Sequence, residues 1–465
     1  MNNNLERKYG LFTAICMVVG IVIGSGVFFK AQTILQKTGG DMPIGIYAWA
    51  IGGAIMLACL LAFSFMGQKY ERCNGIVDYS EATVGSRYGY YMGWFTTTIY
   101  YPAMTSVLAW VSARYTLEFL VSTGLPLTEG SNPVTGPECM ALTVFFLCAA
   151  YAMNALSPKL AGKFQTSTTV IKLIPLGLMM IVGIIYGLIK GTLAQNFATD
   201  AVLTDAVSAN PLFAGVCATA FAYEGWIIAT AINSELKDSK KNLPRALTLG
   251  GIIIAAVYIF YYIGVAGGAT NQDLIEQGAQ VAFTNIFGNV LGNILKLFIA
   301  VSCLGTLNGL MLGCCRGMYS IAVRNEGPMP KMYSQVDNYN NMPNNSSVFA
   351  LMITAAWFLY FYVANLYLPG VGISGKPFMF DSSELPIITI YLMYLPIFFQ
   401  WMRKEKDQNV MRRFVMPILA SVGSIFMVVA CVFSHRMACF WYLILFAVIM
   451  FIGYLVNRSN HKKNA

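Results

Sequence analysis

Four long runs of this chain carry no charged residue, and they constrain its fold more than any other feature. The runs are Gly10–Phe29, Ala246–Gln272, Ser346–Asn365 and Phe414–Ser434. A helix needs about 20 apolar residues to cross roughly 30 Å of hydrocarbon, so each run is long enough. Hydrophobic residues make up 57% of the chain and charged residues only 11%, against about 25% charged in soluble proteins. The sequence therefore predicts an all-α membrane protein, because backbone in lipid must satisfy its own hydrogen bonds.

Hydropathy predicts twelve transmembrane helices joined by short connections. Their approximate limits are residues 10–36, 43–68, 90–121, 138–157, 162–189, 211–236, 246–268, 288–322, 346–365, 383–401, 413–434 and 437–457. An even number of spans puts both termini on one side, and most of the 30 Lys and Arg residues fall in loops on that side. Positive charge is enriched in cytoplasmic loops, so we expect a multi-pass plasma-membrane protein with both termini in the cytoplasm.

Composition argues against several classes of function. The two histidines, His435 and His461, both lie near the C-terminus, which disfavours a histidine-centred hydrolase or a multi-histidine metal site. The formal net charge of +9 is not gathered into a basic helix of the kind that binds nucleic acid. Repeated pore loops and charged rings, which a channel would need, are not found. We therefore expect no enzyme, catalytic residue, cofactor, metal or nucleic-acid partner, and a lipid bilayer as the surroundings.

The first predicted span contains small residues near mid-membrane, in the segment Gly20-Ile-Val-Ile-Gly24-Ser25-Gly26-Val27-Phe28-Phe29. Glycine inside a helix costs about 1 kcal/mol relative to alanine. The segment has two interpretations. It is either a small-residue face on which another helix packs, or a break after which a second half-helix begins. The free N–H groups of such a half-helix behave like roughly half a positive charge and suit a carboxylate.

The sixth predicted span contains a second interruption, Phe221-Ala222-Tyr223-Glu224-Gly225-Trp226. A glycine and polar groups again lie inside an apolar stretch. Spans one and six would each open a set of five helices. Interrupted helices at corresponding positions of two halves point to a transporter site built from inverted repeats. The pair therefore favours two broken helices over two packing faces.

These segments resemble the amino acid–polyamine–organocation (APC) superfamily of transporters. GIVIGSGVFF resembles its first-span signature, and FAYEGW resembles the sixth-span motif of its L-type amino-acid exchanger branch. Further similarity lies in Asn74–Tyr79, Gly305–Gly309, Arg316–Pro330 and Ser383–Ile387. The order and spacing of these motifs extend the resemblance from about residue 8 to residue 430.

The resemblance implies a LeuT-type fold with a 5+5 inverted repeat and discontinuous helices 1 and 6. The expected organisation is a cytoplasmic N-terminus (1–9), a first repeat (10–189), a second repeat (190–401), helices 11 and 12 (402–457) and a cytoplasmic C-terminus (458–465). It also implies a single substrate site at the midplane. There, a zwitterion needs donors at one end and acceptors at the other, because unpaired buried charge is costly.

Carried over position by position, the resemblance implies a substrate-binding set. The carboxylate would meet N–H groups and a hydroxyl from Gly24, Ser25, Gly26 and Val27. The α-ammonium would meet carbonyls around Val22, Phe221, Ala222, Tyr223 and Glu224. Phe221 further resembles the aromatic gate of the family, although ordinary packing would also explain it.

Lys172 lies inside the fifth predicted span, in Thr168-Thr-Val-Ile-Lys172-Leu-Ile-Pro175. A lysine at the bilayer centre costs about 2.5–3.5 kcal/mol on insertion scales and suggests a function by default. The alternative is a structural lysine paired with backbone carbonyls. In related bacterial transporters a lysine at the matching position fills the space where sodium-coupled relatives hold Na⁺. The resemblance thus implies sodium-independent transport, with the ammonium bridging span one near Gly20–Gly24 to span eight.

Glu224 departs from the branch, where small or acidic residues occur. A carboxylate beside the site could bind a cationic substrate side chain, pair with Lys172 or carry a proton, or it could face a watery vestibule. Burial without a partner is costly for a carboxylate. Glu224 therefore leaves the substrate class open at this point.

The function expected from the resemblance is sodium-independent transport of neutral L-amino acids, by alternating-access exchange (antiport). The alternative is proton-coupled uptake, including uptake of cationic amino acids or polyamines. Heteromeric animal relatives join a heavy chain through a cysteine between spans three and four. The context of Cys139 in this chain, Pro137-Glu-Cys139-Met, matches poorly, so we expect no heavy-chain partner.

Overall fold

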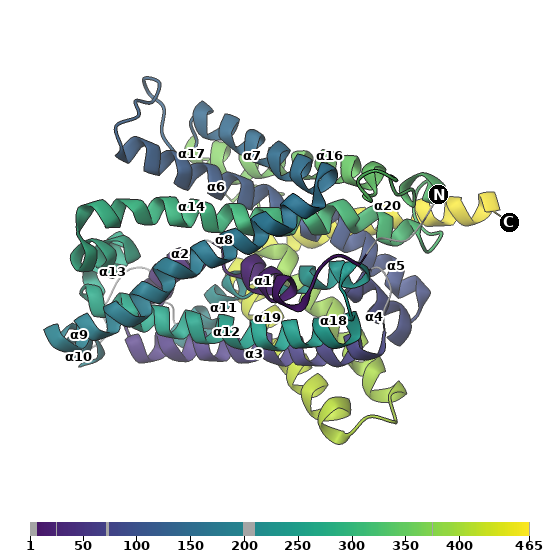
Figure 1. The fold of residues 1–465 in the computed structure, drawn as a ribbon, viewed down its shortest axis with the longest axis horizontal. Helices are drawn as coiled ribbons and strands as arrows, with labels where there is room; N and C mark the ends of the chain where they lie inside the picture. The colour runs from purple at the N-terminus through teal and green to yellow at the C-terminus, as the bar shows by residue number, and fades with distance from the viewer. Residues whose placement is uncertain (1–6, 25, 71–73, 199–209, 374, 465) are drawn as a thin grey trace.

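A computed structural model describes residues 7–24, 26–70, 74–198, 210–373 and 375–464, and within them the chain is almost wholly helical (Figure 1). The single extended contact of these residues is a bridge between Tyr9 and Leu236. The helices are α1 (Leu11–Val22), α2 (Gly26–Thr38), α3 (Met42–Lys69), α4 (Gly75–Thr83), α5 (Ser86–Phe95), η1 (Thr96–Tyr100), α6 (Tyr101–Ser122), α7 (Pro137–Leu156), α8 (Pro158–Leu178), η2 (Met179–Gly183), α9 (Ile184–Lys190), α10 (Thr192–Ala198), α11 (Pro211–Ala222), η3 (Trp226–Glu235), α12 (Ser239–Gly268), α13 (Asn271–Gln277), α14 (Ala279–Ala322), α15 (Pro330–Tyr333), α16 (Asn344–Phe361), η4 (Tyr362–Tyr367), α17 (Leu368–Gly370), α18 (Leu385–Lys404), η5 (Met411–Val415), α19 (Met416–His435) and α20 (Met437–Asn464).

The prediction of an all-α membrane protein is confirmed. Within the described residues, ten helices are long and apolar enough to cross a membrane, and α1 with α2 makes an eleventh as a pair bent by 49°. The third predicted span corresponds to a continuous helical run over residues 86–122, which is not among those helices. The number twelve therefore stays a prediction, whereas a multi-pass protein is established.

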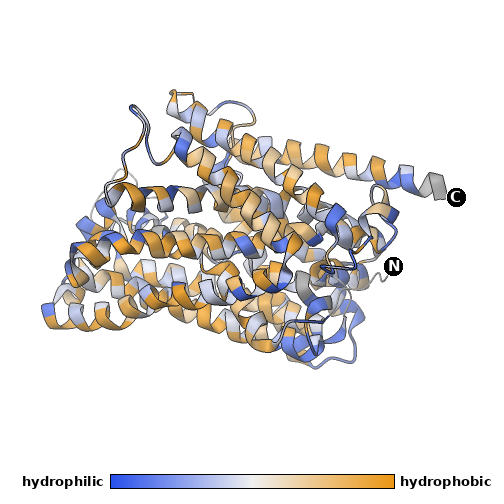
Figure 2. Cartoon of the chain, turned by 45° about the horizontal axis from the view of Figure 1, so that its top comes forward, coloured by the Kyte–Doolittle hydropathy of each residue, from blue (hydrophilic) through white to orange (hydrophobic). Residues whose placement is uncertain are grey.

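Three long helices, α3, α12 and α14, run along the long axis of the molecule, and α3 lies beside α12 (Figure 1). Figure 2 shows apolar residues along the lengths of the helices and polar residues gathered toward their ends. This distribution is what a bundle needs when its sides face hydrocarbon and its ends face water.

Small residues let α12 approach the helix of the fifth span closely. A Cβ added at Gly264 would lie 2.2 Å from the carbonyl oxygen of Met179, and one added at Gly267 would lie 2.0 Å from that of Gly183. No other residue fits there. Close glycine contacts of this kind are the usual means of packing helices in lipid, where apolar burial gives no driving force between them. They fix α12 against the helices around the site.

The N-terminal segment is joined to the end of η3. The N–H of Lys8 donates to the carbonyl of Glu235 at 2.8 Å, and the N–H of Lys237 donates to the carbonyl of Tyr9 at 2.9 Å. The Lys8 ammonium pairs with the Glu235 carboxylate at 2.8 Å, and Arg316 of α14 pairs with the same carboxylate. This cluster of Lys8, Glu235 and Arg316, the inner cluster below, ties three segments together.

Candidate functional site

The first span is interrupted where the glycines predicted it. Helix α1 ends at Val22, and Ile23 is extended, with φ −73° and ψ 90°. The N–H of Gly24 donates to the carbonyl of Val22 at 2.9 Å in a tight turn, and α2 begins at Gly26. Ser25 lies outside the described residues. The first-turn N–H groups of α2 therefore have no helical acceptor behind them.

The sixth span is also interrupted. Helix α11 ends at Ala222, and the chain resumes at Trp226 as the 3₁₀ helix η3. Gly225 between them has a φ of +102°, in the left-handed region that glycine adopts readily and other residues rarely do. The glycine of the FAYEGW motif is therefore the residue that permits this break.

The two breaks face each other. A Cβ added at Gly26 would lie 2.9 Å from the Cα of Ala222, and one added at Gly225 would lie 3.1 Å from the side chain of Ile21. Tyr258 of α12 lies beside both breaks, with its hydroxyl 3.0 Å from the carbonyl oxygen of Val22 and 2.9 Å from that of Ala222. The phenol, with its single hydrogen, can donate to either carbonyl. Tyr258 was not predicted from the sequence.

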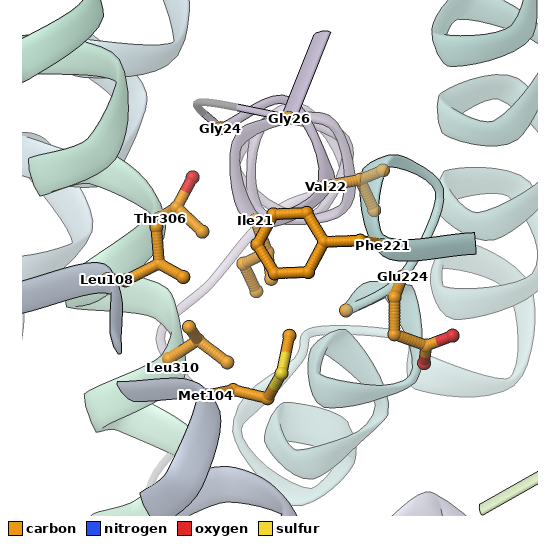
Figure 3. Close-up of a pocket in the computed structure, with 11 residues that line it drawn as sticks. Ile21, Val22, Gly24, Gly26, Met104, Leu108, Phe221, Glu224, Thr306 and Leu310 are labelled. Atoms are coloured by element: carbon orange, nitrogen blue, oxygen red, sulfur yellow. The ribbon is translucent and has the colours of Figure 1, made fainter. Parts of the chain in front are cut away.

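A small cavity of about 20 Å³ lies at the facing breaks (Figure 3). Five predicted residues line it: Val22, Gly24, Gly26, Phe221 and Glu224. Six further residues line it that the sequence analysis did not select: Ile21, Met104, Leu108, Gly225, Thr306 and Leu310. A water molecule needs at least about 10–15 Å³ of such volume, so the site is nearly closed in this conformation.

Three described residues of the predicted substrate-binding set do not line the cavity: Val27, Ala222 and Tyr223. Ala222 contributes its carbonyl to Tyr258, as described above. The Tyr223 side chain points elsewhere, since its hydroxyl donates to the carbonyl of Trp49 at 2.9 Å and its ring packs against that tryptophan. Tyr223 thus packs the interrupted part of the sixth span against α3.

Phe221 is the residue that lines both the small cavity and a larger one of about 280 Å³. The Lys30 ammonium lies 5.4 Å from the centre of the Phe221 ring. Lys30 also pairs with Glu384 at 2.5 Å, and Glu384 accepts a hydrogen bond from Nε2 of His435 at 3.0 Å. This group of Lys30, Glu384 and His435, the outer cluster below, borders the larger cavity through its first two members. The position of Phe221 suits an aromatic gate.

Glu224 is buried, with 3% of its surface exposed. One carboxylate oxygen accepts a hydrogen bond from the Tyr100 hydroxyl at 2.5 Å. Figure 3 shows the carboxylate directed away from the Phe221 ring, so mainly the stem of the side chain meets the cavity. Among the described residues no cationic side chain pairs with it.

Lys172 does not pair with Glu224. Its ammonium donates to the carbonyls of Gly20 at 2.8 Å, Ile23 at 2.5 Å and Ser302 at 2.9 Å. The first two carbonyls belong to the end of α1 and the third to α14, so the lysine bridges spans one and eight as predicted from the resemblance. A fully buried cation is tolerated here because carbonyl oxygens surround it.

The arrangement offers donors from the start of α2 and acceptors from the ends of α1 and α11, across a space too small for bulk water. Such a pairing can hold the two charged ends of an α-amino acid. Within the described residues, no three His, Cys, Asp or Glu side chains gather in a way that could hold a metal ion.

Comparison with known proteins also indicates an amino-acid transporter. The family model described as "Amino acid permease" matches residues 9–455. The serine/threonine exchanger SteT of Bacillus subtilis is 30% identical over 448 residues, which cover 94% of each chain. The human Asc-type amino acid transporter 1 is 24% identical, over 71% of this chain and 62% of its own. The human large neutral amino acids transporter small subunit 2 is 25% identical, over 71% and 60%.

A family model that matches nearly the whole chain, together with a relative of 30% identity over 94% of it, establishes the family. The resemblance to the L-type exchanger branch is confirmed by these relatives. The chain therefore belongs to the amino acid permease family of the APC superfamily, and it is an amino-acid transporter of the membrane rather than an enzyme.

Proposed function

We propose that this protein exchanges neutral L-amino acids across the plasma membrane by alternating access, without sodium. The observation that carries the proposal is the pair of facing breaks at Gly24–Gly26 and Tyr223–Gly225. The substrate carboxylate meets the N–H groups of Gly26 and Val27. The α-ammonium meets the carbonyls of Val22 and Ala222, in place of the Tyr258 hydroxyl or alongside it. These contacts recognise what all α-amino acids share.

The side-chain end of the cavity supports a neutral substrate. Met104, Leu108 and Leu310 form this end, and all three are apolar. The nearest carboxylate, that of Glu224, is engaged by Tyr100 and turned away from the ring of Phe221. A charged substrate side chain would have to lose its water among apolar groups, which is costly. A small apolar or hydroxylated side chain would not.

The surroundings of Lys172 support sodium independence. Three carbonyl oxygens converging on one point resemble the shell that a bound cation takes, and oxygen ligands are what hard cations prefer. The ammonium already supplies a positive charge there. A second cation at the same point would be repelled. The name of the SteT relative, a serine/threonine exchanger, supports exchange as the mode of transport.

Further parts of the proposal concern partners and topology. We place both termini in the cytoplasm, divide the chain into five-plus-five repeats over residues 10–189 and 190–401, and propose function without a heavy chain. Some relatives are named as small subunits, but Cys139 has no exposed surface in this chain. A thiol buried in this way is poorly placed to bridge to another protein.

Proton-coupled uptake is the second candidate, and one observation favours it. Glu224 is a buried carboxylate beside the cavity, and it accepts a hydrogen bond from a tyrosine rather than pairing with a cation. A proton is the simplest means of removing such a charge, and buried acids in membrane transporters often form proton relays. Proton uptake at Glu224 on one side and release on the other would couple transport to a pH gradient.

Purified protein in proteoliposomes separates these possibilities. Labelled serine or alanine is presented outside, with or without unlabelled amino acid inside, in sodium or choline buffer, and with or without a pH gradient. Exchange predicts uptake that requires internal amino acid and is equal in sodium and choline. Uptake into empty vesicles that follows an inward proton gradient would reject exchange in favour of the second candidate. Labelled arginine tests the cationic class in the same vesicles.

A further inference from the structure

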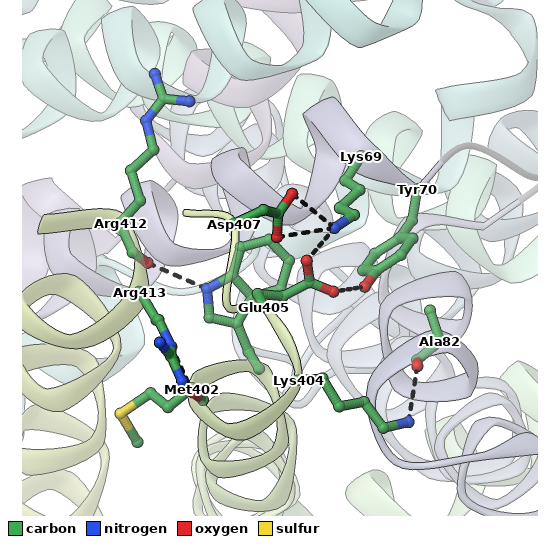
Figure 4. A network of polar contacts seen from close by, with 10 residues as sticks. Lys69, Tyr70, Ala82, Met402, Lys404, Glu405, Asp407, Arg412 and Arg413 are labelled. Carbon is green, nitrogen blue, oxygen red and sulfur yellow. Dashed lines mark hydrogen bonds and ion pairs between the residues drawn. The ribbon is translucent and has the colours of Figure 1, made fainter. Parts of the chain in front are cut away.

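The turn between α18 and α19 is unusually basic. Residues 402–416, called the basic turn below, hold five cationic side chains and two acidic ones. Figure 4 shows three of the cations, Lys404, Arg412 and Arg413, together with both acids. The cationic residues are Arg403, Lys404, Lys406, Arg412 and Arg413. The acidic residues are Glu405 and Asp407. Acidic and basic side chains within one turn usually form ion pairs with each other. The partners of Glu405 and Asp407 therefore determine whether the five cations of the turn stay without an ion pair.

Both acidic residues of the basic turn contact Lys69 at the end of α3. Lys69, the last residue of α3, forms an ion pair with Glu405 and approaches Asp407 at 3.3 Å. The hydroxyl of Tyr70 donates to the other oxygen of Glu405. Glu405 is buried, with 5% of its surface exposed. The acids thus anchor the turn to α3 and are not available to its own cations.

The cations of the turn contact uncharged groups instead. Arg413 donates to the carbonyl of Met402 at 2.9 Å, Lys404 to that of Ala82 at 3.2 Å, and Arg412 to the side-chain amide of Gln68 at 3.2 Å. The guanidinium of Arg412 lies 5.1 Å from the ring of Phe65. Within the described part of the chain, none of the five has an ion pair with a carboxylate.

Exposed apolar side chains surround these cations. Val410 is 69% exposed, and Phe399, Met411 and Phe414 are also exposed. In a membrane protein such residues face lipid tails, so the cations beside them lie where hydrocarbon gives way to head groups. Arginine presents a fork of N–H donors that matches a phosphate, and unpaired basic residues next to a span attract acidic lipids.

We propose that the basic turn is a binding site for the head groups of acidic phospholipids. Arg412 and Arg413 point in different directions in Figure 4 and each offer donors to a head-group phosphate. Lys404 and Lys406 add charge around them, and the acyl chains lie against Phe414 and its apolar neighbours. The bound lipid holds the α18–α19 turn against α3 and stabilises the folded protein. The inference rests on these contacts alone and is independent of which amino acid is transported.

Full-length protein in neutral detergent tests the proposal. Native mass spectrometry measures binding of short-chain phosphatidylglycerol, short-chain phosphatidylcholine and inorganic phosphate, and a thermal melt with each measures stabilisation. We expect the wild type to bind phosphatidylglycerol at least about tenfold more tightly than phosphatidylcholine, which corresponds to about 1.4 kcal/mol. Arg412→Gln/Arg413→Gln is expected to lose this preference. The control Lys240→Gln/Lys241→Gln, which removes two exposed lysines in the first turn of α12, is expected to keep it.

Three outcomes would overturn the proposal: equal binding of the two lipids, equal loss in the control variant, or stabilisation by inorganic phosphate that matches the lipid. The last would make the turn a site for a soluble anion. Folding of the double variant is checked by its melt without lipid. If the double variant does not fold, Lys406→Gln, which changes an exposed side chain, still reports a weaker preference for phosphatidylglycerol.

Discussion

Lys172 is the residue whose surroundings bear most directly on ion coupling. Its ammonium joins the end of α1 to α14 through carbonyls of Gly20, Ile23 and Ser302. Replacing it with alanine leaves these carbonyls without a donor, at a cost of about 1–3 kcal/mol for each unsatisfied group. We expect Lys172→Ala to reduce the initial rate of exchange in proteoliposomes by about tenfold or more.

The matched control for this prediction is Lys296→Ala. Lys296 is a second lysine in a long apolar helix, α14, but it is partly exposed. Its removal is expected to leave the exchange rate within about twofold of the wild type, since surface changes are usually small. Unchanged kinetics in Lys172→Ala would assign Lys172 to structure only.

His435 lies two residues beyond the apolar stretch that ends at Phe433, and it predicts a dependence on pH. Its Nε2 lies 3.0 Å from a Glu384 oxygen, and Lys30 and Asp381 are the other charged groups near it. Burial opposes charge on the imidazole, but the hydrogen bond and charge of Glu384 raise the pKa of His435 above its ordinary value. The outer cluster is therefore most stable below about pH 6.5, the ordinary value, and loses this contribution as the pH rises through the raised pKa.

Because the outer cluster borders the larger cavity, we expect exchange to become faster as the external pH rises from acid to mildly alkaline. Exchange rates are measured at fixed internal pH. His435→Gln is expected to flatten the profile, whereas His461→Gln, which changes the one other histidine of the sequence, is expected to preserve it. A profile that survives His435→Gln would locate the titrating group elsewhere.

At the scale of elements, local sequence could predict the breaks but not what packs against them. A glycine or a polar group inside an apolar run changes the local preference of the backbone, so the ends of α1 and α11 were predictable. Tyr258 carries no such signal, because it lies in an uncharged run of ordinary composition. Lys30 likewise gives no local hint of its partner, since Glu384 lies 354 residues further along the chain. Contacts of this kind depend on how the helices assemble.

Gly26 connects the two breaks and yields a prediction at this scale. A Cβ there would lie 2.9 Å from the Cα of Ala222 and 3.2 Å from its Cβ, so a larger side chain must push α2 away from α11. Overpacking costs about 1–3 kcal/mol, or about 5- to 150-fold in an equilibrium constant. We expect Gly26→Val to lose substrate affinity by about this factor, measured as substrate-induced thermal stabilisation of the purified protein.

Gly177→Val is the matched control, because Gly177 lies in helix α8 and a Cβ added there meets nothing within 4 Å. It is expected to bind substrate like the wild type. Full affinity in Gly26→Val, in protein that is folded and in the membrane, would place the substrate somewhere other than the facing breaks.

At the scale of the whole molecule, a charged cluster lies toward each side of the site, and both are built on a glutamate with two basic partners. Glu235 of the inner cluster meets Lys8 and Arg316. Glu384 of the outer cluster meets Lys30 and His435. The nearly closed cavity lies at the breaks that connect these elements. A transporter that works by alternating access needs its two ends to open in turn, and one separable set of contacts at each end suits that requirement.

This symmetry predicts opposite effects of matched substitutions. Thr230, which is buried in η3 between the break and Glu235, serves as a reporter when replaced by cysteine and treated with a water-soluble maleimide. Glu235→Gln releases η3 from its two cations and is expected to raise the labelling rate of Thr230→Cys about tenfold, the effect of a 1.4 kcal/mol shift between conformations. Glu384→Gln weakens the other end and is expected to lower that rate. Peptide mass spectrometry distinguishes labelling at position 230 from labelling at native cysteines. A rise in both variants would mean that the glutamates stabilise the fold as a whole, because a loosened bundle admits the reagent whichever end is released.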